Sequence, residues 1–117
     1  CIATMCWFSS IVHPSFQRAH RPERVADGEE AHAAVKANGK KSFWANVQEI
    51  DSMIQGNEWI MRNRFTVVDG YALVFYGWGA RSGHPMKELV AYSAWQERMM
   101  NRPTVKKTVE AEQRVAT

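Results

Sequence analysis

Cysteine is scarce in this 117-residue chain, which contains only Cys1 and Cys6. If both cysteines lie on one helix, a rise of about 1.5 Å per residue separates them by about 7.5 Å along the axis. That separation exceeds the limit of about 7 Å between the Cα atoms of an unstrained disulfide. We therefore expect two reduced thiols, as is usual in cytoplasmic proteins.

Long apolar runs and runs of like charge are also missing. No apolar stretch approaches the roughly 18 residues that a membrane-spanning helix needs. The basic residues are scattered and the net charge is only +3, which argues against a nucleic-acid-binding surface. The N-terminal segment has neither a basic leader nor a small-residue cleavage site, so we expect no signal peptide. These absences together predict a cytoplasmic protein that binds neither nucleic acid nor membrane.

Motifs for metal binding and for catalysis are absent as well. The four histidines include no i, i+4 pair, and the two cysteines do not complete a ligand set. No glycine-rich phosphate loop occurs, and Ser9 and Ser10 lack the flanking glycines of a nucleophile elbow. We expect no metal site, no cofactor and no catalytic residue within this chain.

What the sequence does contain is helical periodicity. Residues 2–16 carry small or apolar side chains at alternating steps of four and three, which indicates one face of a helix. Pro14 predicts a kink near His13, because proline removes a backbone donor and crowds the preceding turn. The polar segment 19–27 indicates a connection to a second helix. The positions of the first stripe are Ile2, Cys6, Ser9, His13 and Phe16.

The second predicted helix covers residues 28–54, and Asn38-Gly39 is a point at which it could bend or break. Residues 67–80 are apolar nearly all round, which predicts a central helix in the core. An amphipathic helix and a last helix that begins near Pro103 follow. Their expected inward-facing residues are Leu89, Tyr92, Trp95, Met99, Val105 and Val109. The sequence predicts a single all-α domain over residues 1–117, a bundle of about five helices without a sheet.

Thr66 and Asp69 give the sharpest local signal, a capping box at the start of the central helix. The Thr66 hydroxyl can accept the backbone N–H of Asp69, and the Asp69 carboxylate can accept the N–H of Thr66. A carboxylate in the first turn also suits the positive end of the helix dipole. We expect both residues to act in folding and not in ligand binding.

Three further motifs accompany the box in a fixed order: SIVHPSF at residues 10–16, YGW at 76–78, and YSAWQERM followed by RPTV at 92–105. Together they resemble the C-terminal all-helical domain of bacterial, beta-class-like glutathione transferases over almost the whole chain. One departure from the family pattern is local. Arg62 and Asn63 stand where relatives usually carry a glycine and an acidic residue.

The resemblance implies a site for an apolar electrophile. By this resemblance His13 lines the cleft between two domains, and Trp78 and Phe75 form an aromatic wall that Met5 and Ser9 complete. An apolar wall suits such ligands because their affinity grows with buried apolar area. Alternatives remain open: His13 could cap the carbonyl freed by the following proline or fill the helix face, and Trp78 and Phe75 could be ordinary core residues.

The resemblance also implies what the chain lacks. In the family, a separate thioredoxin-like domain binds the co-substrate glutathione and activates its thiol, and no residue here matches that domain. We therefore expect a helical electrophile-binding and dimerisation domain that does not conjugate glutathione alone. It would bind a hydrophobic small molecule and associate with a second copy or with a thioredoxin-like domain. The alternative is a free-standing, non-catalytic assembly module of the same fold.

Overall fold

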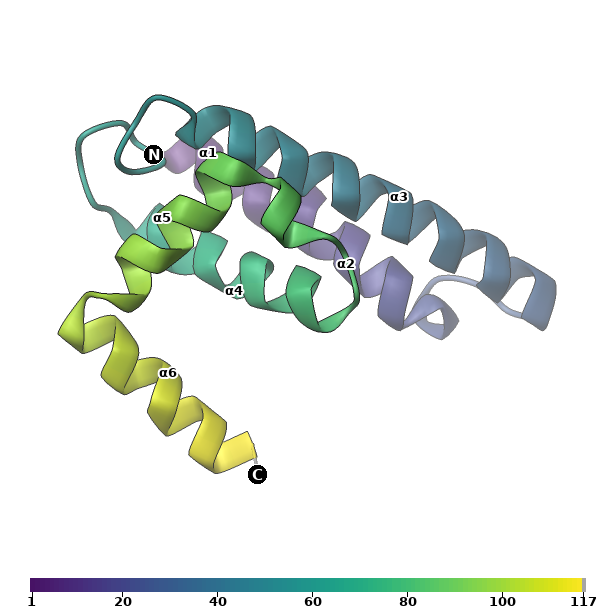
Figure 1. The fold of residues 1–117 in the computed structure, drawn as a ribbon. Coiled ribbons are helices and arrows are strands. Elements are labelled where there is room, and N and C mark those ends of the chain that lie inside the picture. Colours follow the sequence, from purple (N-terminus) through teal and green to yellow (C-terminus); the bar gives the residue numbers. More distant parts are fainter. Residues whose placement is uncertain (117) are drawn as a thin grey trace.

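A computed structural model describes residues 1–116, and for residues 113, 115 and 116 it describes the backbone alone. Within this range the secondary structure is helical, with turns and loops between the helices and one isolated bridge between Trp59 and Arg62 in place of any sheet. Five helical rods make up the fold (Figure 1), which confirms the predicted all-α class. None of these helices is long and apolar enough to span a membrane.

The first rod consists of α1 (Ile2–Trp7), a π-helical turn η1 (Phe8–Val12) and α2 (His13–His20). The His13 N–H donates to the carbonyl of Phe8, five residues back. Pro14 cannot donate, so the wider turn falls just before it. The irregularity expected near His13 is therefore a π-turn that ends at Val12.

The helical stripe predicted at residues 2–16 is not the buried face of this rod. Ile2 is 81% exposed, and Cys6 and Ser9 are exposed as well. The buried face lies one residue earlier along the chain, and it consists of Phe8, Val12, Ser15 and Ala19. Buried Ser15 is satisfied because its hydroxyl donates to the Val12 carbonyl and accepts from the Asn46 amide. A polar residue with such partners fits a core position that its polarity alone argues against.

α3 (Glu29–Ile54) is one unbroken helix that packs along α2. The predicted weak point at Asn38-Gly39 is wrong, because Gly39 is buried in the helix crossing. A Cβ at Gly39 would lie 2.5 Å from the Ala19 nitrogen. Glycine is therefore required here by the close approach of two backbones, and it does not break the helix.

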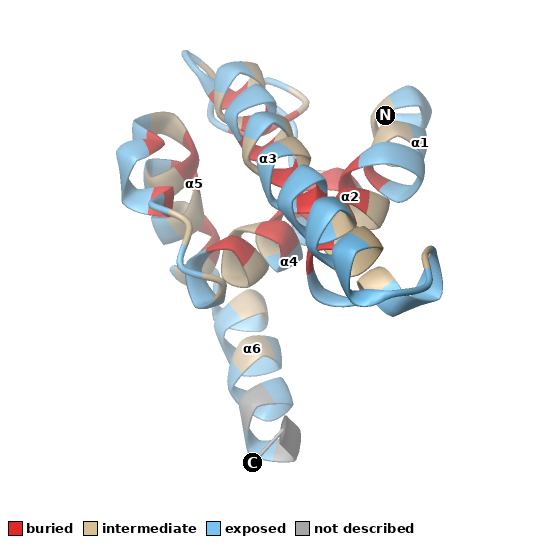
Figure 2. Cartoon of the chain, turned by 90° about the vertical axis from the view of Figure 1, so that its right-hand side faces the viewer, coloured by how far each residue is buried: buried red, intermediate tan, exposed pale blue. Residues whose placement is uncertain are grey.

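α4 (Val67–Arg81) confirms the predicted central helix, and its inner face is buried (Figure 2). It is not buried all round, since Val67 is 66% and Val74 43% exposed. α5 (Val90–Met100) packs against α3 and α4. The short 3₁₀ turns are η2 (Pro22–Arg24) and η3 (Met86–Glu88).

α6 (Pro103–Ala116) packs mainly against α5 and stands away from the other helices (Figures 1 and 2). The Arg102 guanidinium lies 3.9 Å from the Phe65 ring and 5.6 Å from the Trp59 ring at the joint between α5 and α6. The predicted inward residues Val105 and Val109 are only half-buried. They face a hollow between α6 and α4.

Candidate functional site

His13 lies on α2 and faces Tyr71 of α4. Its Nδ1 is 3.0 Å from the Tyr71 hydroxyl oxygen, and its Nε2 is 3.5 Å from the Gln17 side-chain nitrogen. His13 and Tyr71 thus form a hydrogen bond between α2 and α4 in which either partner can be the donor. The predicted alternative in which the His13 ring caps a carbonyl is not what this geometry shows.

A continuous set of aromatic rings surrounds His13. The Trp78 ring lies 5.0 Å from His13 in an edge-to-face arrangement, and Phe16 stacks on Trp78 at 4.4 Å with 19° between the planes. Such ring pairs stabilise one another beyond their area burial. Trp78 and Phe16 are both half-buried. They leave an apolar edge that a ligand can reach.

Of the other predicted wall residues, Phe75 adjoins both His13 and Trp78, with 6.4 and 5.7 Å between ring centroids. Phe75 is fully buried and packs inside the core against Phe8 and Tyr71. Ser9 is exposed, and its hydroxyl donates to the Cys6 carbonyl. Met5 is half-buried against the core. The structure therefore brings His13 and Trp78 together at the surface and places Phe75 behind them. Met5 and Ser9 do not line the hollow beside Trp78, within residues 1–116.

Two residues of this site were missed by sequence reasoning. Tyr71 and Phe16 supply the hydrogen-bond partner of His13 and the stacking partner of Trp78. Phe16 was assigned to a helix stripe, although its position three residues after His13 places both on one helix face. Tyr71 comes two residues after Asp69, and nothing in its spacing indicates contact with a helix 58 residues away.

Trp78 also borders a hollow of about 300 Å³ between α4 and the last two helices. Leu73 and Val74 are shared with a second, more apolar hollow of about 210 Å³ that reaches Val105 and Val109. The polar side chains at the first hollow are Arg81, Gln96 and Glu112. This region has the size of a small-ligand site and is open to solvent, since α6 closes only one side.

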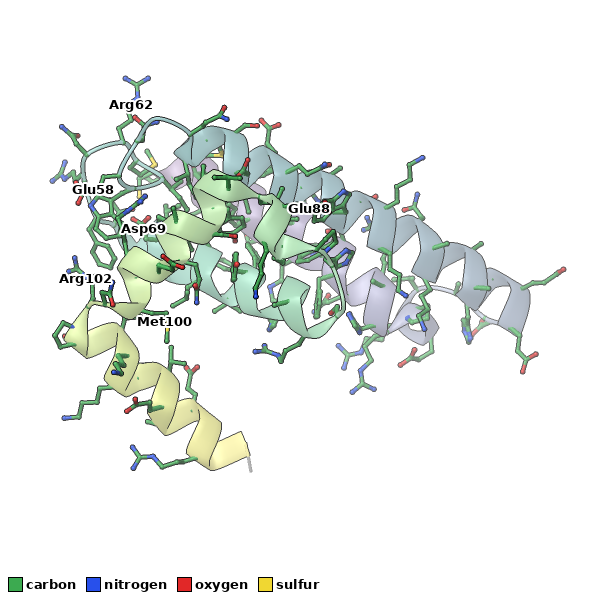
Figure 3. All side chains as sticks on the ribbon, viewed as in Figure 1. Glu58, Arg62, Asp69, Glu88, Met100 and Arg102 are labelled. Carbon is green, nitrogen blue, oxygen red and sulfur yellow. The ribbon has the colours of Figure 1, made fainter. Side chains whose placement is uncertain are left out.

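Asp69 lies fully buried between α4 and α5 (Figure 3), and its carboxylate holds three separate segments. Asp69 Oδ2 accepts the N–H of Thr66 at 2.9 Å, and Thr66 Oγ1 accepts the N–H of Val68 at 3.3 Å. These bonds confirm the predicted capping box. Asp69 Oδ1 accepts from the Ile60 N–H at 3.2 Å and from the Trp95 indole at 2.9 Å. The Asp69 carboxylate thus also links α5 to the loop that precedes α4.

Tyr92 supplies a second buried polar contact near this point. Its hydroxyl donates to the Ala72 carbonyl of α4, and its backbone N–H donates to Asp51 of α3 at 2.8 Å. Burial, and then the neighbouring Tyr76, raise the pKa of the Tyr92 hydroxyl well above its usual value of 10.0. The phenol therefore stays neutral and serves as a structural donor.

Histidine, cysteine and acidic side chains do not gather in groups of three or more anywhere in the described part of the chain. No protein-family model and no curated protein sequence matches this chain.

Solved structures align with 95% of the chain. A glutathione transferase homologue from Sulfitobacter with bound glutathione matches with a TM-score of 0.85 at 17% identity. A glutathione S-transferase from Xylella fastidiosa matches with a TM-score of 0.82 at 22% identity. A beta-class enzyme from Sphingomonas chungbukensis matches with a TM-score of 0.78 at 24% identity.

The chain has the fold of the glutathione transferase C-terminal helical domain. That helical domain accounts for 53%, 54% and 52% of the three relatives, so the chain spans about half of their length. The resemblance drawn from the sequence motifs is confirmed at the level of the fold.

Proposed function

We propose that this chain is the ligand-binding helical half of a glutathione transferase-like protein. It binds an apolar electrophile against the edge formed by Trp78 and Phe16, beside His13. The observation that carries the proposal is the half-buried ring set of His13, Trp78 and Phe16, with the Tyr71 hydroxyl 3.0 Å from His13 Nδ1. The rings supply apolar contact, and the hydrogen-bonded pair of His13 and Tyr71 supplies one directional bond to a polar atom of the ligand.

A thioredoxin-like domain is the partner that this role requires. Glutathione is the co-substrate, and the thioredoxin-like domain binds it, because the helical half offers no group to activate a thiol. The exposed α4 residues Val67 and Val74 form an apolar face that suits packing against another domain or a second copy. We place the protein in the cytoplasm and expect no conjugation activity from this chain alone.

Binding of an uncharged apolar probe tests the site. Fluorescence titration of the 117-residue chain with N-phenyl-1-naphthylamine should give micromolar affinity, and free glutathione should show no measurable binding in calorimetry. Trp78→Leu should weaken probe binding by about fivefold or more, equivalent to about 1 kcal/mol. Trp7→Leu is the matched control, because Trp7 is also half-buried but borders a different hollow with Met53.

An unchanged affinity in Trp78→Leu, or an equal loss in both variants, would contradict the proposed site. Micromolar binding of glutathione would contradict the division of roles between two domains. Thermal unfolding of each variant shows whether a loss of binding reflects a loss of structure.

The alternative function is a non-catalytic assembly module of the same fold. It is favoured by the open apolar hollow along Val74, Val105 and Val109, which a protein partner could fill. The coding sequence immediately upstream separates the two functions. An in-frame thioredoxin-like domain supports the transferase half, and a different sequence there supports the assembly module.

A further inference from the structure

A polar hollow of about 430 Å³ lies in the loop between α3 and α4. Its lining residues are Gly56, Asn57, Glu58, Arg62 and Asn63. Figure 1 shows this loop at one end of the bundle and the turn after α2 at the other. The helical rise along α4 from Thr66 to Trp78 is about 18 Å. The hollow is therefore separate from the aromatic edge at Trp78.

Positive charge gathers around this hollow. The Arg98 guanidinium of α5 donates to the Glu58 carbonyl through Nε at 3.2 Å and through Nη2 at 2.7 Å. The Arg102 guanidinium lies 3.9 Å from the centre of the Phe65 ring in the same loop. Arg62 lines the hollow itself. None of these three arginines forms an ion pair in the part of the chain that the structure describes, so their charges are not neutralised by a carboxylate.

Arg62 has a backbone conformation that glycine adopts more easily. Its φ of 71° lies in the left-handed region, where a Cβ atom is sterically unfavourable. Its side chain is exposed and points to solvent in Figure 3. Among the described residues, its guanidinium has neither a hydrogen bond nor an ion pair. Residues in such strained conformations cluster at ligand sites, and the fold itself gives no reason for an arginine here.

The hollow offers both hydrogen-bond donors and acceptors. Arg62 and the Asn63 amide nitrogen can donate, whereas the Glu58 carboxylate and the Asn63 amide oxygen can accept. A peptide chain suits this mixture because it carries both N–H and C=O groups. The phosphate backbone of a nucleic acid offers acceptors alone, and Glu58 would repel it. One face of the Phe65 ring is already occupied by Arg102, which disfavours the stacking of bases there.

We infer that this hollow binds an acidic segment of a partner protein. Carboxylate side chains of the segment pair with Arg62, and Arg98 and Arg102 add positive potential beside it. The peptide groups of the segment exchange hydrogen bonds with Glu58 and Asn63. The inference goes beyond the proposed function, because the hollow and the aromatic edge lie at opposite ends of α4 and either site can fail without the other.

Fluorescence anisotropy of the full chain with a fluorescein-labelled hexaglutamate peptide tests the site at low ionic strength, since salt screens exposed charges. Arg62→Gly should weaken binding by about fivefold or more. Its melting temperature should stay the same or rise, because glycine relieves the left-handed backbone. Arg24→Gly makes the same change in net charge at an exposed position of η2, and its affinity should stay within about twofold of the unaltered chain. Glu58→Gln should strengthen binding by about twofold or more, because it removes negative charge from the hollow.

The outcomes separate a specific site from general attraction. A labelled hexaglutamine peptide should show no measurable binding. Equal losses in Arg62→Gly and Arg24→Gly overturn the inference, because affinity would then follow net charge alone. Weaker binding in Glu58→Gln, or no binding of hexaglutamate to the unaltered chain, overturns it as well. A labelled oligothymidylate that binds more tightly than hexaglutamate and depends equally on Arg62 would identify a nucleic acid as the partner instead. Binding of N-phenyl-1-naphthylamine beside Trp78 is measured separately, so none of these results decides the proposed function.

Discussion

The indole nitrogen of Trp95 donates to Asp69 Oδ1 at 2.9 Å, and both side chains are completely buried. The same oxygen accepts the Ile60 N–H, and the second oxygen accepts the Thr66 N–H. A buried carboxylate is stable only when hydrogen bonds replace its hydration. Here one carboxylate satisfies donors from the loop before α4, from the α4 cap and from α5.

Removal of the Asp69 carboxylate should therefore cost more than the loss of a helix cap. Asp69→Ala leaves three buried donors without an acceptor, and we expect a loss of about 3 kcal/mol in the free energy of unfolding. A cap alone is worth about 1 kcal/mol, so Thr66→Ala serves as the comparison. Urea denaturation followed by circular dichroism measures both values. Similar losses in the two variants would show that the Ile60 and Trp95 contacts contribute little.

Coupling between Asp69 and Trp95 can be measured directly with a double-mutant cycle. Trp95→Phe keeps an aromatic ring in the core and removes the N–H donor. With Asp69→Asn as the second change, we expect a coupling energy of about 1 kcal/mol. Additive losses in the double variant would contradict an energetic role for this hydrogen bond.

Much of the fold was predictable because capping boxes and apolar periodicity are local signals. Thr66 and Asp69 are three residues apart, and both sides of the box form as predicted. The further contacts of Asp69 with Ile60 and Trp95 depend on the tertiary fold and leave no trace in spacing. The first rod was misread because apolar residues occur on several of its faces, among them Ile2 and Phe8. Periodicity could not show that the buried stripe passes through Ser15, whose partners lie on another helix.

Of the candidate site, His13 and Trp78 were predicted from a family resemblance and not from the chemistry of their spacing. Tyr71 and Phe16 were missed because their contacts join helices far apart along the chain. The role of Gly39 was missed for a related reason. Glycine in a helix is unfavourable by propensity, and only the approach of a second backbone explains its presence.

Two glycines with opposite surroundings provide a matched test of packing. Gly39→Ala places a methyl group against the backbone of Ala19, so we expect α2 and α3 to separate and stability to fall by about 2 kcal/mol or more. In Gly70→Ala the added methyl group has no neighbour within 4 Å, because position 70 is on the exposed face of α4. The higher helix propensity of alanine should therefore stabilise the fold by about 1 kcal/mol. Thermal unfolding should move in opposite directions for the two variants. A shift in the same direction would contradict the close helix crossing.

Arg62 is a site where the local backbone is strained. Its φ of 71° lies in the left-handed region, and among the described residues other than glycine no other positive φ occurs. Its N–H and carbonyl pair with Trp59 at 2.9 and 2.7 Å, which holds the turn in place. Arg62 points to solvent in Figure 3 and is exposed. Arg62→Gly should raise stability by up to about 1 kcal/mol, because glycine adopts this conformation without a steric cost.

Arg64→Gly is the control for Arg62→Gly, since Arg64 is exposed in the same loop and has no positive φ. It should be neutral or destabilising. Both changes can be measured by the melting temperature at equal ionic strength. A lower melting temperature in Arg62→Gly would show that the left-handed backbone carries no appreciable strain.

His20 and His84 make the stability of the fold depend on pH. The folded-state pKa values of His20 and His84 are lower than the unfolded value of 6.5. The unfolded chain therefore binds more protons as the pH falls through about 6.5, and folding stability is lost in that direction. Melting temperatures between about pH 8 and pH 5 should decline, and His20→Gln/His84→Gln should flatten the decline. An identical pH profile in the double variant would show that His20 and His84 do not cause the decline.

α6 is held by the contact of Arg102 with the Phe65 ring and by its half-buried residues Val105 and Val109. None of its described side chains is fully buried in the core. Segments with few buried apolar contacts open at a lower free energy than the core. α6 should thus form its own unit of local unfolding, with backbone amides that exchange with deuterium sooner than those of α3. A molecule that bridges α4 and α6 would slow exchange in α6 before it altered exchange anywhere else, which makes this last helix a built-in reporter for occupancy of the hollow.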